Sequence, residues 1–247
     1  MKHKDYFSGH SKLYATFRPT YPAELYTFIF QHLKNRDIAW DCATGNGQVA
    51  NYLSKHFKEV QATDISTQQL EVAAQVKNIK YTVCPAEKTP FSLHHFDLIT
   101  VGQALHWFNL NEFYAEVNRV GKPGSLLAVW GYGLLSVNAD IDELFLDFYN
   151  NIVGPYWDEA RKVVENEYND IPFPFTNIPS PKFFMEVEWT LEQFTGYLTT
   201  WSATQKYIQT NGHNPVTEFT EKLKPIWKTV HSRSVTFPVF LKLGVIG

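Results

Sequence analysis

The chain has 247 residues, of which 44% are hydrophobic and 19% charged, so it is long enough and apolar enough to bury a sizeable core and is not disordered. Its 13 glycines and 13 prolines exclude a collagen-like or linker-dominated protein. With 22 basic against 25 acidic residues the formal net charge is -3, which disfavours a nucleic-acid partner.

The cysteines and the apolar stretches bear on the compartment. Only Cys42 and Cys84 are present, both in apolar strand-like runs, and we expect two buried thiols rather than a disulfide. A reducing, cytoplasmic location follows from this expectation. Residues 1–12 carry charge with no apolar region after them, and residues 125–137 are too short and too interrupted by glycine to span a bilayer. We therefore expect no signal peptide and no membrane partner.

From residue 38 onward, short apolar runs alternate with helical periodicity, which is typical of successive βα units on a parallel sheet. The pattern predicts strands at residues 38–42, 59–63, 79–84, 96–102 and 125–130, with helices at 48–57, 67–76 and 111–120. Five strands with interleaved helices form an α/β, doubly wound, mostly parallel sheet. Ligands of such sheets bind beyond the carboxyl ends of the strands.

The alternation of short apolar runs with helical periodicity changes after residue 130. The pattern predicts helices at 141–152 and 159–168, a proline-rich loop at 171–181, strands at 183–189 and 234–245, and helices at 191–199 and 216–230 between them. No linker divides the chain, so we expect one domain over residues 1–247 with a seven-stranded sheet. Within it, residues 38–131 form the cofactor-binding core, residues 1–37 a covering segment, and residues 132–182 and 190–231 helical insertions that cover the substrate.

A glycine-containing turn follows the first predicted strand. Gly45 and Gly47 would let the backbone approach a ligand closely, and Asp64, which ends the second strand, could accept both hydroxyls of a ribose. Residues 45–50 also satisfy the dinucleotide fingerprint, so a nicotinamide-dependent oxidoreductase is an alternative. Asp41 lies in the same turn, where it would repel a pyrophosphate. This charge favours a cofactor that carries an ammonium group.

These residues resemble the first motif of the class I S-adenosylmethionine-dependent methyltransferases, in particular their small-molecule branch of the trans-aconitate methyltransferase type. The resemblance covers nearly the whole chain, with further matches at Tyr14, Arg18-Pro19, Pro85-Ala86-Glu87, the run from Phe96 to Phe108, Lys122-Pro123-Gly124 and Trp201-Ser202-Ala203. It implies a Rossmann-like methyltransferase that uses S-adenosylmethionine. A cofactor-binding protein without catalytic activity is a further alternative.

The resemblance also implies a cofactor site. Its residues would be Tyr14, Arg18, Asp41, Ala43, Gly45, Gly47, Asp64, Ile65, Ala86, Glu87 and Gln103. Arg18 could pair with the methionine carboxylate, because its planar fork suits that geometry. Pro85 stands where relatives often have Asp, so the adenine amino group would need another acceptor, such as Glu87 or a backbone carbonyl.

On the acceptor side we expect His106, Trp107 and Tyr132 to contact the substrate. His106 is also the candidate catalytic residue, as a substrate contact or a general base, with a structural hydrogen bond as the alternative. The other histidines show no metal-ligand spacing, and we predict no metal.

The resemblance suggests O-methylation of a carboxylic acid. Between residues 132 and 181, however, nine acidic residues face only Arg161 and Lys162, a net charge of -7 (2 − 9). This charge would repel a polyanion and favours a small, mainly apolar acid or hydroxylated molecule. The sequence does not predict the oligomeric state.

Overall fold

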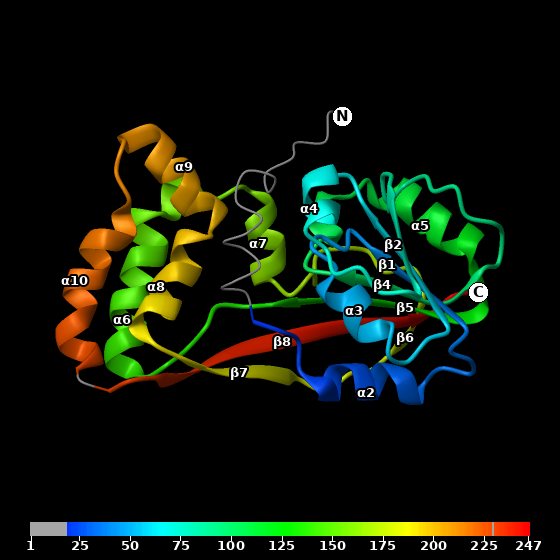
Figure 1. Cartoon of the computed structure of the whole chain (residues 1–247), viewed down its shortest axis with the longest axis horizontal. Helices are drawn as coiled ribbons and strands as arrows, with labels where there is room; N and C mark the ends of the chain where they lie inside the picture. Colours follow the sequence, from blue (N-terminus) through cyan, green and yellow to red (C-terminus); the bar gives the residue numbers. More distant parts are fainter. Residues whose placement is uncertain (1–18, 229) are drawn as a thin grey trace.

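The computed structural model describes residues 19–228 and 230–247, in which a central sheet has the strand order β3-β2-β1-β4-β5-β8-β6 (Figure 1). The strands are β1 Ile38–Cys42, β2 Glu59–Asp64, β3 Ile79–Val83, β4 Phe96–Gly102, β5 Gly121–Tyr132, β6 Thr176–Ile178, β7 Phe183–Trp189 and β8 Arg233–Val245. Strands β1 to β5 are parallel, and β8 is antiparallel to β5. Because the strand order reverses between β1 and β4, the predicted doubly wound sheet is confirmed.

The last edge of the sheet is divided between two short strands. Leu243 of β8 pairs with both β5 and β6, so β6 lies on the edge of β8 away from β5. Thr236 pairs with Glu186 of β7 and bridges to Ser136, which follows β5 in the chain, so β7 lies on that same outer edge. The strands predicted at 183–189 and 234–245 are thus present as β7 and β8, and β6 is an additional, eighth strand of the sheet.

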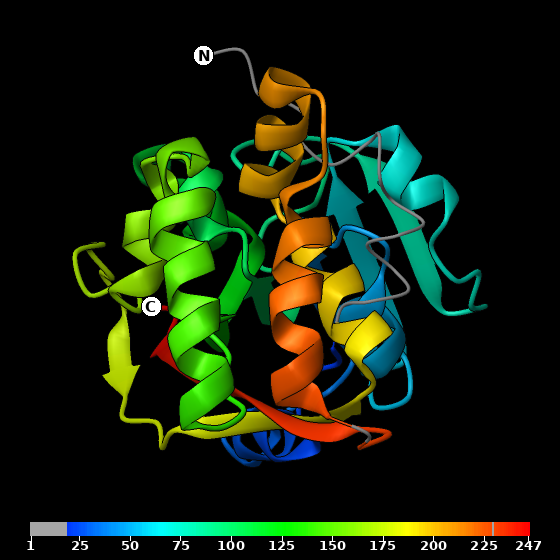
Figure 2. The same ribbon diagram turned by 90° about the vertical axis from the view of Figure 1, so that its left-hand side faces the viewer.

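The helices of the described residues fall into two groups. They are α2 Ala23–Gln31, α3 Gln48–Leu53, α4 Thr67–Glu71, α5 Leu110–Val120, α6 Ala139–Asp147, α7 Ala160–Glu165, α8 Leu191–Thr199, α9 Ser202–Asn211 and α10 Pro215–Trp227. Figures 1 and 2 show α6, α8, α9 and α10 gathered beyond one end of the sheet, next to β7. Helix α7 lies between this group and the parallel strands. A π-helical turn at Phe148–Ile152 and a 3-10 turn at Gly154–Tyr156 connect α6 to α7.

Several predicted elements differ from the structure. The helices predicted at 48–57, 67–76 and 159–168 are shorter and end at Leu53, Glu71 and Glu165. After α3, the side-chain nitrogen of Asn78 donates to two backbone carbonyls of the following turn, at 2.8 and 3.0 Å, and so favours turn over helix.

Three elements were not predicted. The segment predicted as a proline-rich loop contains β6, which has only three residues and so carries no usable alternation. Helix α9 was missed because its polar sequence shows little amphipathic pattern. Helix α2 buries an apolar stripe of Leu25, Tyr26, Ile29 and Phe30, but lies in the segment expected only as a cover.

The sheet separates two apolar cores, and a buried carboxylate aligns its strands. Neighbouring residues such as Ala39 and Trp40 contribute to opposite cores, as expected for a strand covered on both faces. The Asp97 side chain accepts hydrogen bonds from the backbone N–H groups of Asp37 and Ile38 at 2.9 and 3.0 Å and pairs with Lys122 at 2.6 Å. It thereby holds β1 beside β4 and β5. None of the helices described is both long and apolar enough to cross a membrane.

Candidate functional site

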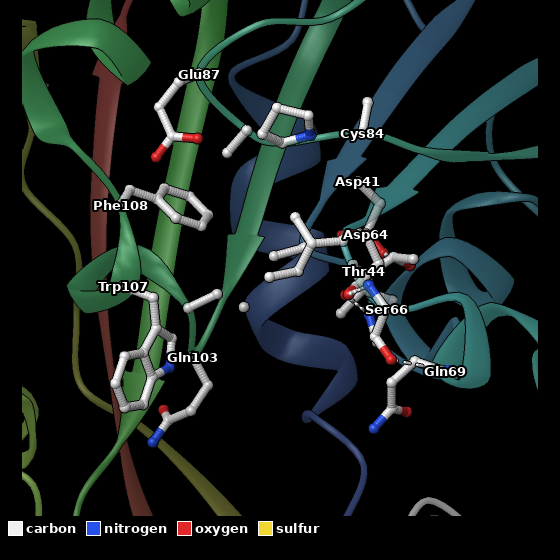
Figure 3. A pocket seen from close by; sticks show the side chains of 18 of the residues that line it. Asp41, Thr44, Asp64, Ser66, Gln69, Cys84, Glu87, Gln103, Trp107 and Phe108 are labelled. Atoms are coloured by element: carbon white, nitrogen blue, oxygen red, sulfur yellow. Dashed lines mark hydrogen bonds between the residues drawn. The ribbon is translucent and has the colours of Figure 1, made fainter. Parts of the chain in front are cut away.

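A cavity of about 1200 Å³ opens at the carboxyl ends of the central strands (Figure 3). Asp41 from β1, Asp64 from β2, Gly102 from β4 and Tyr132 from β5 all line it. This is the switch point of the sheet, where the helices after β1 and β4 pass to opposite faces and leave a crevice. The predicted position of the site is therefore where the structure has its cavity.

Asp41 organises the turn after β1. Its side chain is 1% exposed and accepts hydrogen bonds from the Thr44 hydroxyl, from the Thr100 hydroxyl at 2.9 Å and from the Ala50 backbone N–H at 3.0 Å. Burial raises the pKa of Asp41 to about 6, while these hydrogen bonds favour the ionised form. The carboxylate thus holds β1, β4 and the start of α3 around the turn and contributes its charge to the cavity.

The two glycines of the turn have different roles. Both have left-handed backbone, with φ 57° at Gly45 and φ 81° at Gly47. A Cβ on Gly45 would meet no atom within 4 Å, so its backbone faces open space in the cavity. A Cβ on Gly47 would lie 2.6 Å from the Tyr81 hydroxyl, and Gly47 does not line the cavity. Gly45 therefore permits ligand approach, whereas Gly47 permits packing against β3.

Ala43 has φ 53°, a conformation that a residue with a Cβ adopts only at a cost. Ala43 lines the cavity, as predicted.

Asp64 and Ile65 lie beside the turn, at the end of β2. The Asp64 carboxylate accepts from the Gly45 N–H at 2.8 Å with one oxygen and from the Ser66 N–H at 2.9 Å with the other. Each carboxylate oxygen can accept more than one hydrogen bond, so these contacts orient the group without exhausting it. Ile65 is 43% exposed and lines the cavity beside it. An oriented carboxylate next to an accessible apolar side chain suits a ribose that carries a flat heterocycle.

Gln103 bridges the ends of β4 and β5. Its backbone N–H donates to the Trp130 carbonyl at 2.8 Å, and its side-chain Oε1 accepts from the Tyr132 N–H at 2.9 Å. Its Nε2 donates to no residue among 19–228 and 230–247, and the side chain lines the cavity. This arrangement leaves a fixed donor facing the ligand, as expected for a contact with a carboxylate.

Ala86 and Glu87 lie farther along the same cavity. One carboxylate oxygen of Glu87 accepts from the Asn109 N–H at 2.9 Å, at the start of α5. Ala86 is 7% exposed and offers a small apolar surface. Pro85 lines the cavity between Cys84 and Ala86 and has no side-chain acceptor.

These residues fit S-adenosylmethionine. Asp41 supplies negative charge for an ammonium group, Asp64 an acceptor for ribose hydroxyls, and Ile65 an apolar contact for adenine. The open space at Gly45 accommodates a ligand against the backbone. A pyrophosphate would instead meet the carboxylates of Asp41 and Asp64, which disfavours a dinucleotide.

The predicted acceptor residues do not all reach the cavity. Trp107, which is 37% exposed, and Tyr132 line it, whereas His106 does not. Instead His106 Nδ1 lies 2.8 Å from the Tyr168 hydroxyl. Burial raises the pKa of Tyr168, so its hydroxyl keeps its proton, and the tautomer of the imidazole decides which of the two groups donates. The sequence analysis considered a substrate contact, a general base and a structural hydrogen bond for His106, and the geometry favours the structural hydrogen bond.

The electrostatics of His106 follow from its surroundings. Burial, together with the nearby positive charge of Arg161, lowers the pKa of His106 to about 3. The imidazole is therefore neutral throughout the physiological pH range.

Two of the predicted cofactor residues, Tyr14 and Arg18, lie outside the described residues. Cavity residues that the sequence did not suggest include Thr44, Ser66, Gln69, Cys84, Pro172 and Pro174. Ser66 caps α4 and shows a recognisable capping pattern, while the two prolines were visible only as a loop. Cys42 is buried as expected, but Cys84 is only half-buried. Within the described ranges no three metal-ligating side chains gather.

Comparison with protein families gives a match to the model of a methyltransferase domain over residues 40–129. A relative described as a methyltransferase from Dictyostelium discoideum is 35% identical over 98% of this chain and 95% of its own length. A relative from Saccharomyces cerevisiae, described as S-adenosylmethionine-dependent, is 22% identical over 86% of this chain and 84% of its own length.

Among solved structures, one described as a type II methyltransferase from Anaeromyxobacter dehalogenans is similar with a TM-score of 0.87 and 34% identity. The match covers 93% of this chain and 98% of the other. The similarity therefore extends over the insertions as well as the parallel core.

The raised pKa of Asp41 predicts that ligand binding depends on pH. A cofactor ammonium is attracted only by the ionised carboxylate, so affinity for S-adenosylhomocysteine should rise about five- to tenfold between pH 5 and 7.5 as Asp41 loses its proton. Calorimetric titration of the wild type and of Asp41→Asn measures this. The variant should bind weakly with little pH dependence, and the exposed control Asp37→Asn should behave as wild type. A wild-type affinity that is level across this range would contradict the role of Asp41.

Proposed function

The chain belongs to the class I S-adenosylmethionine-dependent methyltransferases, and on this premise we propose that it methylates a small carboxylic acid at oxygen. Family membership displaces the nicotinamide-dependent alternative, and S-adenosylmethionine is the cofactor. The observation that carries the carboxylate proposal is the state of His106. Its pKa of about 3 and its hydrogen bond to Tyr168 make it a poor base near neutral pH. A carboxylate is already ionised there and needs none.

The chemistry is an in-line displacement. When bound, S-adenosylmethionine supplies an electrophilic methyl group on a positively charged sulfur. A carboxylate oxygen of the acceptor forms the new bond to the methyl carbon as the carbon–sulfur bond breaks and its electron pair stays on sulfur, giving a methyl ester and S-adenosylhomocysteine. Charge is neutralised in this step, and no proton is transferred.

The protein's own contribution is positioning and exclusion of water. The turn held by Asp41 and the donor presented by Gln103 fix the cofactor end of the cavity. Trp107 and Tyr132 line the cavity next to Gln103 and present apolar ring surface toward an acceptor. Fixing both reactants in line accounts for much of the rate in such transfers. Exclusion of water also favours a step that removes charge.

We also propose that the acceptor is a small molecule and that the protein acts in the cytoplasm. A net charge of -3 suits a small-molecule acceptor better than a nucleic acid. The two free thiols suit a reducing compartment such as the cytoplasm.

A screen of carboxylic acids, alcohols and amines for production of S-adenosylhomocysteine tests the function directly. Turnover confined to amines or alcohols would overturn the carboxylate class, and binding without turnover of any acceptor would favour a non-catalytic cofactor-binding protein.

Replacement of Asp64 should weaken cofactor binding. Asp64→Ala removes the acceptor proposed for the ribose hydroxyls and the bond that positions the Gly45 N–H, a loss of about 1.5 to 3 kcal/mol. Calorimetric titration with S-adenosylhomocysteine should show affinity lower by one to two orders of magnitude. The matched control Asp37→Ala removes an exposed carboxylate paired with Lys58 and should leave affinity unchanged. Equal affinities for both variants would limit Asp64 to a strand-end role.

Substitution of His106 tests the acceptor class through the pH profile. Because the pKa of His106 is about 3, the single-turnover rate at saturating cofactor should be level from about pH 6 to 8, and His106→Gln should keep much of it. Tyr168→Phe, which removes the hydrogen-bond partner, should behave similarly. If the wild-type rate instead rises through pH 6 to 7 and His106→Gln abolishes the rise, His106 is the base and the acceptor is a hydroxyl or amine compound.

We also propose that the insertion over residues 132–182 covers the bound reactants. Pro172 and Pro174 line the cavity, and the Tyr114 hydroxyl holds this loop by donating to the Pro172 carbonyl at 2.8 Å. No cavity residue comes from residues 190–228, so the observations support a direct cover only for the first insertion. Amide hydrogen exchange should show that S-adenosylhomocysteine increases protection of residues 138–170 together with the Gly45 turn, with little change in α10. Protection confined to the Gly45 turn and Asp64 would argue against the cover.

A further inference from the structure

The Arg161 cation, on α7, lies among aromatic side chains. Figure 1 shows α7 between the additional helices and the parallel strands. The Arg161 side chain is 18% exposed, and its Nε donates to the Tyr149 hydroxyl at 3.1 Å. Its guanidinium carbon lies 5.3 Å from the centre of the Trp157 ring and 6.0 Å from that of Tyr149. Aromatic faces attract a guanidinium and hold its plane in a defined orientation.

The outer nitrogens of this guanidinium make no hydrogen bond within the described part of the chain. Neither Nη1 nor Nη2 of Arg161 has a hydrogen-bond partner among residues 19–228 and 230–247, and the side chain is 18% exposed. The nearest carboxylate, Glu165, lies 3.7 Å from Nε and accepts a hydrogen bond from the Tyr149 hydroxyl. Glu165 therefore neutralises only part of the charge, on the side of the guanidinium away from the free nitrogens. An arginine has five N–H donors, and most of those of Arg161 remain available.

The charge of Arg161 acts on the acceptor end of the cavity. It interacts electrostatically with Tyr132, which lines the cavity, and with His106, the neighbour of cavity residue Trp107. Helix α7 also packs against the 3-10 turn Leu105–Trp107, which contains His106. Arg161 does not itself line the cavity, but its charge acts on Tyr132, which does, and its helix packs against the turn that carries Trp107.

We propose that Arg161 binds the carboxylate of the methyl acceptor and is the residue that determines specificity for acids. This inference rests on the proposed function. A guanidinium fork matches the two oxygens of a carboxylate and gains strength where water is scarce. The surrounding rings suit an apolar or aromatic body behind one carboxylate. The net charge of -7 over residues 132–181 opposes a second or third anionic group.

The test measures binding without requiring turnover. The protein saturated with S-adenosylhomocysteine is titrated with benzoate, phenylacetate, hexanoate and octanoate, each beside its neutral amide, and followed by thermal unfolding and calorimetry. At least one acid should bind at least tenfold more tightly than its amide. If no acid is preferred over its amide across this set, the proposal is wrong.

Variants then assign the preference to one side chain. Arg161→Gln should weaken binding of the preferred acid by roughly ten- to a hundredfold and leave the amide unaffected. Arg161→Lys keeps the charge but not the fork and should retain an intermediate affinity. The control Lys162→Gln removes a neighbouring cation that is 73% exposed and paired with Glu159, and should change nothing. Equal losses in Lys162→Gln and Arg161→Gln, or none in either, would overturn the assignment.

Kinetics separate this inference from the function on which it rests. With an accepted acid, Arg161→Gln should raise the KM for the acceptor at least tenfold, with a smaller change in kcat and an unchanged KM for S-adenosylmethionine. If acids are turned over and the acceptor KM is the same in the wild type and in Arg161→Gln, the proposed function holds and the role of Arg161 is rejected. An acid preference that depends on Arg161, without turnover of any acid, would reject the function and keep the binding site.

Discussion

The buried carboxylate of Asp41 is the constraint on which the site depends. A carboxylate removed from water is costly unless hydrogen bonds replace its hydration. Here Thr44, Thr100 and the Ala50 N–H supply them, and each comes from a different part of the fold. Satisfying one charge therefore fixes the position of β1, β4 and α3 at once. The turn that carries Gly45 has no freedom to move away from the cavity while those bonds persist.

Charge is divided between the two ends of the site. Asp41 and Asp64 place negative charge where a cofactor presents its ammonium and hydroxyl groups. In the role proposed for it, Arg161 supplies positive charge to the acceptor end, where it interacts electrostatically with Tyr132. A cationic cofactor and an anionic acceptor would each be attracted to its own end and repelled from the other. Such an arrangement would order the two reactants before any close contact forms, and the neutral His106 adds no charge to it.

Much of this organisation could be predicted from the sequence, because the βα core repeats a strong local pattern. The five parallel strands, the turn at Gly45 and the acid at Asp64 each depend on residues close together in the chain. The contact between His106 and Tyr168 joins residues 62 positions apart and left no local signal. The same holds for β6, whose three residues owe their extended form to β8. Both features depend on tertiary contacts that the local sequence does not reveal.

Strand β8 connects the parallel core to the part of the sheet that leads into the additional helices. Its second half, from Val239 to Val245, is hydrogen-bonded to β5, which ends at Tyr132 in the cavity. Its first half, from Arg233 to Val239, is paired with β7, which leads directly into α8. The same thirteen-residue strand thus belongs to the parallel core and to the part of the sheet beneath the additional helices. Hydrogen-bonded strands cannot slide past one another without breaking the hydrogen bonds between them. If these helices move relative to the cofactor turn, β8 must therefore either bend or stay in place while other segments move. Motion that opens the cavity is therefore expected in the connections around α7, where Arg161 lies, rather than in the sheet.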